Sequence, residues 1–399
     1  MPSAGAAAFT PEESLEELRT LAESAGAEVQ EAVLQQRASA DAATLVGAGK
    51  VSELAELVRL HDAETVIFDS ELSPTQLRNL EKALDCKVLD RTQLILDIFA
   101  RRARTREGQL QVELAQLNYL LPRLTGRGAA MSRLGGGIGT RGPGETKLET
   151  DRRRIYRRVR KLEQDLETVR AGRSIQRRQR QGVPLATVAL VGYTNAGKST
   201  LFNGLTGAGV LADARMFATL DATVRHVTLP SKRRVLLSDT VGFIRNLPTT
   251  LVKAFRATLE EVTEAALLLH VVDVSSPHAS QYMAHVRKVL EEIGAAEKPQ
   301  ILVLNKIDLA AATMPDPKAI AISARTGLGI DALVTAIDAA IELDPVERAC
   351  FRVPVAEGAA LNLLHERARI LETRYDGDVV HIEAEAPASV RRQLARYAL

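Results

Sequence analysis

The sequence lacks several features that would place it in common protein classes. No apolar run approaches the ~18 residues needed to cross a bilayer, and the amino terminus has no early lysine or arginine of a secretory signal. The two cysteines, Cys86 and Cys350, lie far apart and form no CxxC pair, which argues against a disulfide framework or a zinc ribbon. None of the seven histidines forms an HExxH motif. We therefore expect a protein of the reducing cytoplasm that is not a zinc hydrolase.

Charge is balanced over the whole chain but not along it. The 399 residues include 52 Lys+Arg and 50 Asp+Glu, a formal net charge of +2. Residues 1–100 carry 8 basic and 18 acidic side chains, residues 101–181 carry 21 and 8, and residues 182–399 carry 23 and 24. The net charges of the three segments are −10, +13 and −1. The basic middle segment predicts a surface that faces a polyanion.

Residues 1–106 are expected to form a small α/β domain. Helical and strand-like patterns alternate in this part of the chain, which is typical of strands that pair in parallel. One helical pattern begins at Pro11, and two others cover Ser52–Leu60 and Pro74–Leu84. The strand-like runs are Val29–Leu34 and Thr65–Phe68.

A helical hairpin is expected over residues 107–182. The pattern is helical from Arg91 to Pro122 and resumes beyond a loop, residues 126–144, that contains eight glycines. In the second helix apolar residues recur at spacings of 4, 3, 4 and 3, as in a coiled-coil seam: Ile155, Val159, Leu162, Leu166 and Val169. Two apolar-striped helices joined by a flexible loop predict an antiparallel pair.

Residues 183–345 alternate strand and helix, and residues 346–399 predict a small α+β module of the order βαββα.

The first strand of residues 183–345, Thr187–Val191, precedes a full GxxxxGK[ST] motif: Gly192-Tyr193-Thr194-Asn195-Ala196-Gly197-Lys198-Ser199. Such a loop binds phosphates through its backbone N–H groups and the helix that follows. Lys198 would contact the β- and γ-phosphates, and the Ser199 hydroxyl would bind Mg²⁺.

Three further motifs follow the P-loop in the order of a guanine-nucleotide domain. Each comes at the carboxyl end of an expected strand: Asp239-Thr240-Val241-Gly242, Asn305-Lys306-Ile307-Asp308 and Ser323-Ala324-Arg325. Gly242 would sense the γ-phosphate, whereas Asp308 would accept hydrogen bonds from guanine N1 and N2, a pattern that adenine cannot match. The set predicts a Ras-like P-loop GTPase domain that binds GTP or GDP.

Two positions bear on the switch regions. Switch I is expected within Phe217-Ala218-Thr219-Leu220-Asp221-Ala222-Thr223, where Thr219 and Thr223 are equally suited to bind Mg²⁺. After Gly242, where a glutamine could orient the attacking water, the chain has Phe243. An apolar side chain cannot polarise water, so no catalytic residue is assigned and hydrolysis is expected to depend on a partner.

Taken together, these motifs resemble the HflX-type, ribosome-associated GTPases of the translation-factor-related class. The resemblance rests on GYTNAGKS, FATLD and DTVGF at residues 192–199, 217–221 and 239–243, and on GGGIGTRGPGETKLE at 135–149 followed by Asp151-Arg152-Arg153. It implies that Ser199 and Thr219 bind Mg²⁺ and that Phe217–Asp221 form switch I. It also implies binding to the large ribosomal subunit, with splitting or rescue of ribosomes under stress. One departure is Ala222, where the family commonly has proline.

The basic hairpin is the expected contact to ribosomal RNA. Cationic side chains near the glycine-rich loop can neutralise phosphates, and glycines allow the backbone to approach RNA closely. The candidates are Arg127, Arg133, Arg141, Lys147, Arg152 and Arg153. A solvated helix face without a partner is the alternative interpretation of the charge. The hairpin holds only two aromatic residues, Tyr119 and Tyr156, which favours folded RNA over a single strand.

Two other functions remain open at this point: a ribosome-assembly GTPase or RNA chaperone that separates no subunits, and a regulatory protein that binds other RNA. Nothing in the sequence suggests an obligate dimer, so a monomer is expected. A second GK pair, Gly49-Lys50, is followed by Val51 and lacks the P-loop pattern. We interpret it as a turn that leads into the helix at Ser52.

Overall fold

The structure is a computed structural model whose described residues are 10–37, 39–124, 143–180, 185–207, 216–245, 256–309, 318–341 and 345–399. By its contacts the chain divides into two compact units. Unit 1 comprises Met1–Gly172, Asp213–Asp221 and Arg245–Arg256, and unit 2 comprises Arg173–Ala212, Ala222–Ile244 and Ala257–Leu399. The expected switch I residues 217–221 therefore pack as part of unit 1.

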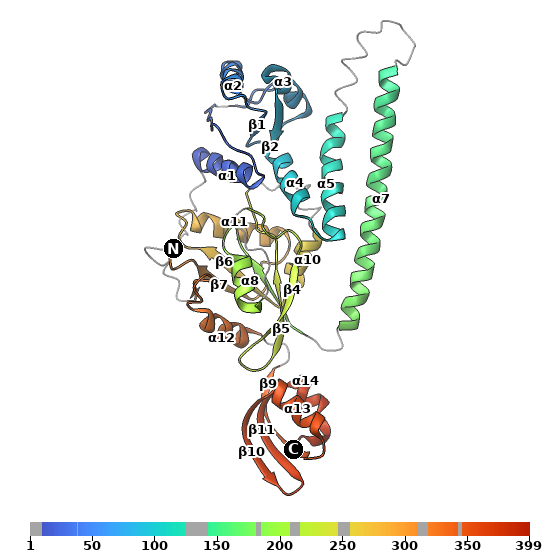
Figure 1. The fold of residues 1–399 in the computed structure, drawn as a ribbon, viewed down its shortest axis with the longest axis vertical. Helices are drawn as coiled ribbons and strands as arrows, with labels where there is room; N and C mark the ends of the chain where they lie inside the picture. Colours follow the sequence, from blue (N-terminus) through green and yellow to red (C-terminus); the bar gives the residue numbers. More distant parts are fainter. Residues whose placement is uncertain are drawn as a thin grey trace. The chain divides into compact units, whose positions relative to one another are not determined.

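Unit 1 begins with a small α/β layer, coloured blue in Figure 1. Its elements are α1 (Pro11–Ser24), α2 (Ala48–His61), β1 (Thr65–Phe68), α3 (Pro74–Leu84) and β2 (Lys87–Asp90). A capping box opens α1: the Thr10 hydroxyl accepts from the Glu13 N–H, and the Glu13 carboxylate accepts from the Thr10 N–H. β1 pairs with β2 in parallel, which confirms the expected α/β arrangement.

Two expectations for this part of unit 1 are wrong. Residues 29–34 form no strand, because the sheet here consists of β1 and β2 alone and the run has no neighbour to pair with. The helical pattern from Arg91 to Pro122 is also interrupted: α4 (Arg91–Arg102) ends and α5 (Arg106–Leu124) begins after a short break. Ala103 has an extended backbone at the break, and the Thr105 hydroxyl accepts from the Gly108 N–H as a cap for α5.

The hairpin pairs α5 with α7 (Pro143–Arg180), and Figure 1 shows the two helices side by side. Leu110 on α5 is buried against Leu162 and Leu166 on α7, and their half-buried neighbours Leu114, Leu117 and Val169 extend the seam. The apolar stripes predicted from the sequence thus pack against each other, because burying them removes both stripes from water. The loop between the helices, including Arg127, Arg133 and Arg141, lies outside the described residues.

Unit 2 contains a six-stranded sheet in the order β4-β5-β3-β6-β7-β8. The strands are β3 (Thr187–Val191), β4 (Thr223–Thr228), β5 (Arg234–Asp239), β6 (Leu267–Asp273), β7 (Gln300–Asn305) and β8 (Ile320–Ala321), and the helices are α8 (Lys198–Thr206), α10 (Arg256–Glu264), α11 (Ala279–Glu292) and α12 (Ile330–Ala340). All neighbouring strands are parallel except β4, which pairs with β5 in the antiparallel sense. Val188, Leu190, Leu269 and Val271 of the central strands form a core with Phe202 of α8 and Leu333 of α12.

The carboxyl-terminal module has the expected order βαββα. Its elements are β9 (Val346–Pro354), α13 (Gly358–Arg367), β10 (Arg369–Asp376), β11 (Val379–Pro387), α14 (Ala388–Gln393) and the 3-10 turn η1 (Ala395–Tyr397). The three strands form an antiparallel sheet in the order β10-β11-β9. Phe351 and Ile382, which are fully buried, pack with Leu364 of α13 and Val390 of α14 as a separate core. The expected α/β class is confirmed, with a small parallel α/β layer and a helical hairpin followed by a larger mixed sheet and this module.

Candidate nucleotide site

The P-loop joins β3 to α8 and surrounds a buried ammonium group. Gly197 has φ 91°, and Lys198 is the first residue of α8. The Lys198 Nζ donates hydrogen bonds to the carbonyl oxygens of Gly192, at 3.1 Å, and Tyr193, at 2.8 Å. Burial lowers the pKa of Lys198 to about 8, and the charge of Asp239 acts in the opposite direction. An anion at this loop would stabilise the charged form of the lysine.

The next residue of the P-loop, Ser199, contacts a carboxylate at the end of β5. The Ser199 hydroxyl donates to Asp239 Oδ2 at 2.8 Å, and Asp239 is the fully buried last residue of β5. A hydroxyl beside a carboxylate matches the hard-oxygen preference of Mg²⁺, which binds one or two protein oxygens and substrate phosphates. These two residues therefore fit the ion that the sequence predicts.

The Asp239–Gly242 motif lies directly against the P-loop. The Thr194 N–H donates to the Phe243 carbonyl at 2.8 Å, and the Phe243 N–H donates to the Gly192 carbonyl at 3.1 Å. A Cβ on Gly242 would lie 2.9 Å from Thr194 Cα and 3.0 Å from Lys198 Nζ, so only glycine fits there without a shift. Phe243 itself is buried. Its apolar side chain cannot orient water, and the dependence of hydrolysis on a partner stays a prediction.

Asn305 holds two loops of the site together. Its Nδ2 donates to the Ala196 carbonyl at 2.8 Å, and its Oδ1 accepts from the Ala324 N–H at 2.9 Å. The residue is buried, so both amide positions are satisfied within the protein. The Ala324 N–H of the Ser323–Arg325 motif thus donates to Asn305 in this structure. Asn305 thus positions the P-loop and the Ser323–Arg325 loop with respect to each other.

The remaining base-recognition residues differ in burial. Lys306 has φ 64°, and its Nζ contacts Asp273 Oδ2 at 2.6 Å. Ser323 is fully buried, and its hydroxyl accepts from the Thr326 N–H at 3.2 Å. Asp308 is exposed, as a carboxylate that accepts hydrogen bonds from a base must be.

Sequence reasoning missed three residues next to this site. Asp273 ends β6, so its place at a strand's carboxyl end was the signal that could have identified it. Tyr282 of α11 stacks on Tyr193 with ring centroids 4.0 Å apart, and His285 Nε2 lies 3.0 Å from the Ile244 carbonyl. No motif marks Tyr282 and His285, because both lie on α11 and reach Tyr193 and Ile244 only in the folded chain.

The expected switch I residues pack within unit 1. Phe217 is buried with its ring edge on Phe99 of α4, at a centroid distance of 4.7 Å. Thr219 is also buried. Thr223, the alternative Mg²⁺ ligand, is the first residue of β4 and pairs with Asp239. The structure therefore brings together the P-loop, Asp239–Gly242, Asn305 and Ser323–Ala324 in unit 2, and the assignment of Thr219 to the metal stays a prediction.

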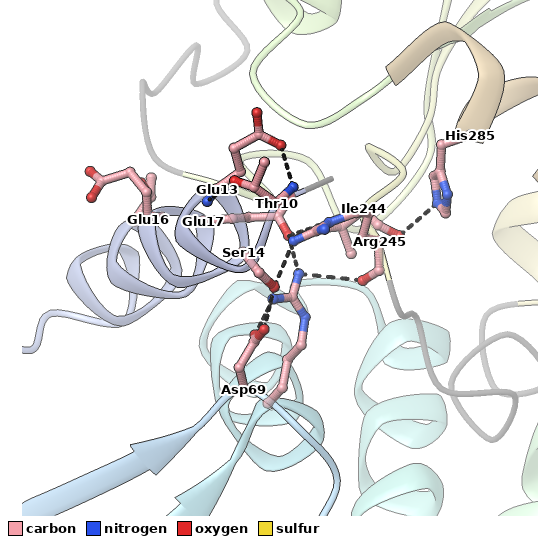
Figure 2. A network of polar contacts seen from close by, with 11 residues as sticks. Thr10, Glu13, Ser14, Glu16, Glu17, Asp69, Ile244, Arg245 and His285 are labelled. Atoms are coloured by element: carbon pink, nitrogen blue, oxygen red, sulfur yellow. Dashed lines mark hydrogen bonds and ion pairs between the residues drawn. The ribbon is translucent and has the colours of Figure 1, made fainter. Parts of the chain in front are cut away.

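Arg245, three residues after Gly242, joins a partly buried network of polar side chains in unit 1 (Figure 2). Its guanidinium donates to the Ser14 hydroxyl at 2.8 Å and lies 3.4 Å from Glu17 Oε2. Arg91 forms ion pairs with Glu17 and Asp69, and the Ser14 hydroxyl donates to Asp69. Burial lowers the pKa of Arg91, but the two carboxylates outweigh it and leave this pKa above its ordinary value.

The basic residues of α7 are partly described. Arg152 and Arg153 are exposed on this helix, as a surface that contacts RNA requires. Arg158 pairs with Glu113 of α5 at 2.6 Å. Lys147 belongs to α7, but its side chain, like all of Arg127, Arg133 and Arg141, lies outside the described residues.

The fold and the site define a P-loop GTPase whose nucleotide domain follows an α/β domain and a helical hairpin. The family described as "50S ribosome-binding GTPase" matches residues 187–306. The families described as "GTP-binding GTPase N-terminal" and "GTP-binding GTPase Middle Region" match residues 12–100 and 102–180.

Relatives match over nearly the whole chain. GTPase HflX of Caldanaerobacter subterraneus subsp. tengcongensis is 49% identical over 97% of this chain and 90% of its own length. GTPase HflX of Escherichia coli is 46% identical over 87% and 83%. A GTP-binding protein from Sulfolobus solfataricus, solved in complex with GDP, is 26% identical over 83% of this chain and 96% of its own, with a TM-score of 0.46. This chain belongs to the HflX family of GTPases, and it binds and hydrolyses GTP.

Within the described parts of the chain, no helix combines the length and the apolar character that a membrane crossing needs.

Proposed function

We propose that this HflX-family GTPase binds the large (50S) ribosomal subunit and splits or rescues stalled or idle ribosomes under stress. The observation that carries the proposal is the exposed basic surface of α7, which bears Arg152 and Arg153 in the unit that also contains residues 217–221. Exposed arginines bind RNA phosphates and release counterions. The description of the matching family as 50S ribosome-binding supports this partner. The protein would act as a monomer in the cytoplasm.

The nucleotide site supports Mg²⁺-dependent hydrolysis with an external stimulus. Ser199 and Thr219 would hold the metal, with Asp239 behind the Ser199 hydroxyl. Bound Mg²⁺ would neutralise charge on the β- and γ-phosphates. Lys198 would bind the phosphate oxygens, and the exposed Asp308 would select guanine. Because Phe243 is buried and apolar, the ribosome would supply the group that orients water. The isolated protein is therefore expected to turn over GTP slowly.

Sedimentation with purified 70S ribosomes tests the proposal. With a nonhydrolysable GTP analogue, we expect the protein to migrate with large subunits and free subunits to accumulate. The double variant Arg152→Ala/Arg153→Ala should bind more weakly, with a shallower salt dependence and unchanged GTP affinity. Arg59→Ala/Lys82→Ala removes two exposed cations from α2 and α3 and is the matched control. If the protein does not migrate with large subunits under any nucleotide condition, the proposal is wrong.

A second function is favoured by the same basic surface. An assembly GTPase or RNA chaperone would bind ribosomal RNA through α7 without separating subunits. The sedimentation profile distinguishes the two functions, since comigration with 50S particles without accumulation of free subunits from 70S ribosomes supports assembly.

A further inference from the structure

A carboxylate from the expected switch I segment occupies the amino terminus of α5. Asp221 Oδ2 accepts from the backbone N–H groups of Arg104, at 2.7 Å, and Thr105, at 2.8 Å. Asp221 Oδ1 accepts from the Thr105 hydroxyl at 2.6 Å, and the same hydroxyl accepts from the Gly108 N–H at 3.0 Å. Arg104 and Thr105 immediately precede α5, and the Thr105 hydroxyl caps the first turn through the Gly108 N–H. A negative charge beside a helix amino terminus is also stabilised by the helix dipole. Asp221 therefore fixes the capping residue of α5 from more than a hundred residues away.

The segment that carries Asp221 is attached to unit 1 at two more points. The Met216 N–H donates to the Ser24 hydroxyl at the end of α1, at 3.0 Å. The Phe217 ring packs edge-on against Phe99 of α4. Phe217 has φ 58°, a left-handed conformation that a bulky residue adopts only when its surroundings require it. The segment is thus held by α1, α4 and α5 together, which fixes where Asp221 meets the helix.

Gly108 leaves the space that this contact needs. A Cβ at this position would lie closer than 3.0 Å to Asp221 Oδ1 and 3.2 Å from the Thr105 hydroxyl oxygen. Glycine is less favourable than alanine in a helix. Gly108 lies in the first turn of α5, where it makes the helix less stable than alanine would. The room that it leaves for the Asp221 carboxylate offsets this loss of stability.

We propose that Asp221 is a positioning residue that couples the nucleotide site to the basic hairpin. Asp221 holds Thr105, the residue that caps α5, and α5 packs on α7 through Leu110 and Leu162. When the segment rearranges between GDP and GTP, the carboxylate leaves or regains the helix end, and the stability of this end of the hairpin changes with it. The inference rests on the proposed assignment of residues 217–221 as switch I.

Amide hydrogen exchange of the full-length protein tests the coupling. The amides of Arg104, Thr105 and Gly108 are compared with GDP and with a nonhydrolysable GTP analogue. We expect their exchange rates to differ about tenfold to a hundredfold between the two nucleotides, the range for losing charge-assisted hydrogen bonds. Gly108→Ala should abolish the difference while GTP affinity stays unchanged. Gly49→Ala is the matched control, because a Cβ there meets nothing within 4 Å at the start of α2.

A second pair of variants covers the case in which Gly108→Ala fails to fold. Asp221→Asn keeps an oxygen that can accept the two N–H bonds and should retain a smaller nucleotide-dependent difference, because these bonds are no longer charge-assisted, whereas Asp221→Ala should lose it. Equal exchange with both nucleotides in the wild type, or a difference that survives in Asp221→Ala, would overturn the proposal. Fluorescent-nucleotide titration of the same samples reports GTP binding separately. No ribosome is present, so a failure here is distinguishable from a failure of ribosome binding.

Discussion

The two units each bury a cation, but they surround it differently. Lys198 of unit 2 is 6% exposed and donates to the neutral carbonyls of Gly192 and Tyr193. Arg91 of unit 1 is 2% exposed and is paired with the carboxylates of Glu17 and Asp69. Their pKa values move in opposite directions: burial lowers that of Lys198 to about 8, whereas the two carboxylates outweigh burial at Arg91.

This difference separates a binding group from a structural one. A buried ammonium with only neutral hydrogen-bond partners gains stability when an anion arrives, which suits a phosphate site. A buried guanidinium that already has two carboxylates gains nothing from a further anion. It joins elements instead, since Glu17 lies on α1, Asp69 follows β1, and Arg91 itself begins α4. The two sites therefore respond to different perturbations.

Arg91→Ala should have the largest effect on stability. Removing Arg91 leaves the buried Glu17 carboxylate with only the more distant Arg245, at 3.4 Å, which costs up to about 3–5 kcal/mol of unfolding free energy. Urea unfolding measures this loss of free energy, and the transition that shifts should be the one in which unit 1 unfolds. Lys50→Ala, which breaks an exposed ion pair with Glu53, is the control. A loss below about 1 kcal/mol for Arg91→Ala would show that the network contributes little.

Lys198→Ala should leave the fold intact and abolish function. Without the ammonium, GTP affinity and hydrolysis should fall at least about a hundredfold, the scale for removing one charge-stabilising donor. Lys50→Ala serves again as the control, because Gly49-Lys50 in α2 lacks the P-loop pattern and should not affect GTP affinity. Equilibrium titration with a fluorescent GTP analogue provides the measurement. If both variants weaken binding equally, a second nucleotide site in unit 1 must be considered.

The pKa of Lys198 predicts opposite pH trends for binding and stability. Above pH 8 the lysine loses its proton in the nucleotide-free protein, while bound phosphates retain it, so GTP affinity should fall by up to about tenfold per pH unit. The unfolded chain binds this proton up to about pH 10.4. Between about pH 8 and pH 10.4 the unfolded chain holds this proton and the folded chain does not, so the free energy of unfolding rises with pH. Calorimetry in buffers of different ionisation enthalpy would show proton uptake on binding; no uptake at pH 9 contradicts the assignment.

Arg158→Ala should have the smallest effect. Its pair with Glu113 joins α5 and α7 at an exposed position, where the Arg158 and Glu113 side chains are 44% and 39% exposed. Solvent screens such a pair, so the urea midpoint should not shift measurably. The comparison with Arg91→Ala then isolates burial as the cause of the difference. A shift of similar size in both variants would contradict it.

The nucleotide motifs could be recognised in the sequence because each of them is short and contiguous. Gly192–Ser199, Asp239–Gly242 and Asn305–Asp308 each follow a buried strand, and the parallel order of those strands brings them to one edge. The role of Asn305 as a link between two loops could not be predicted in the same way. It depends on the Ala196 carbonyl and the Ala324 N–H, and backbone groups leave no mark on the sequence.

Unit 1 was harder to predict because its polar contacts join distant residues. Glu17, Asp69 and Arg91 show only ordinary charges in the sequence, and nothing in the spacing connects them with Arg245. Helix starts at Pro11 and Pro74 were predictable, since proline and a capping residue act locally. The break between α4 and α5 was not, because Asp221 contributes to it from another part of the chain.

The length of α7 gives the contacts at the start of α5 a mechanical consequence. Between Pro143 and Leu166, where the start of α5 packs, α7 extends about 35 Å. A rotation of one degree about this contact therefore displaces the start of α7 by about 0.6 Å, by simple geometry. Hydrogen bonds that tilt the start of α5 by a few degrees would move the far end of the hairpin by about 2 Å. A small tilt at the start of α5 would thus become a larger displacement at the far end of the hairpin.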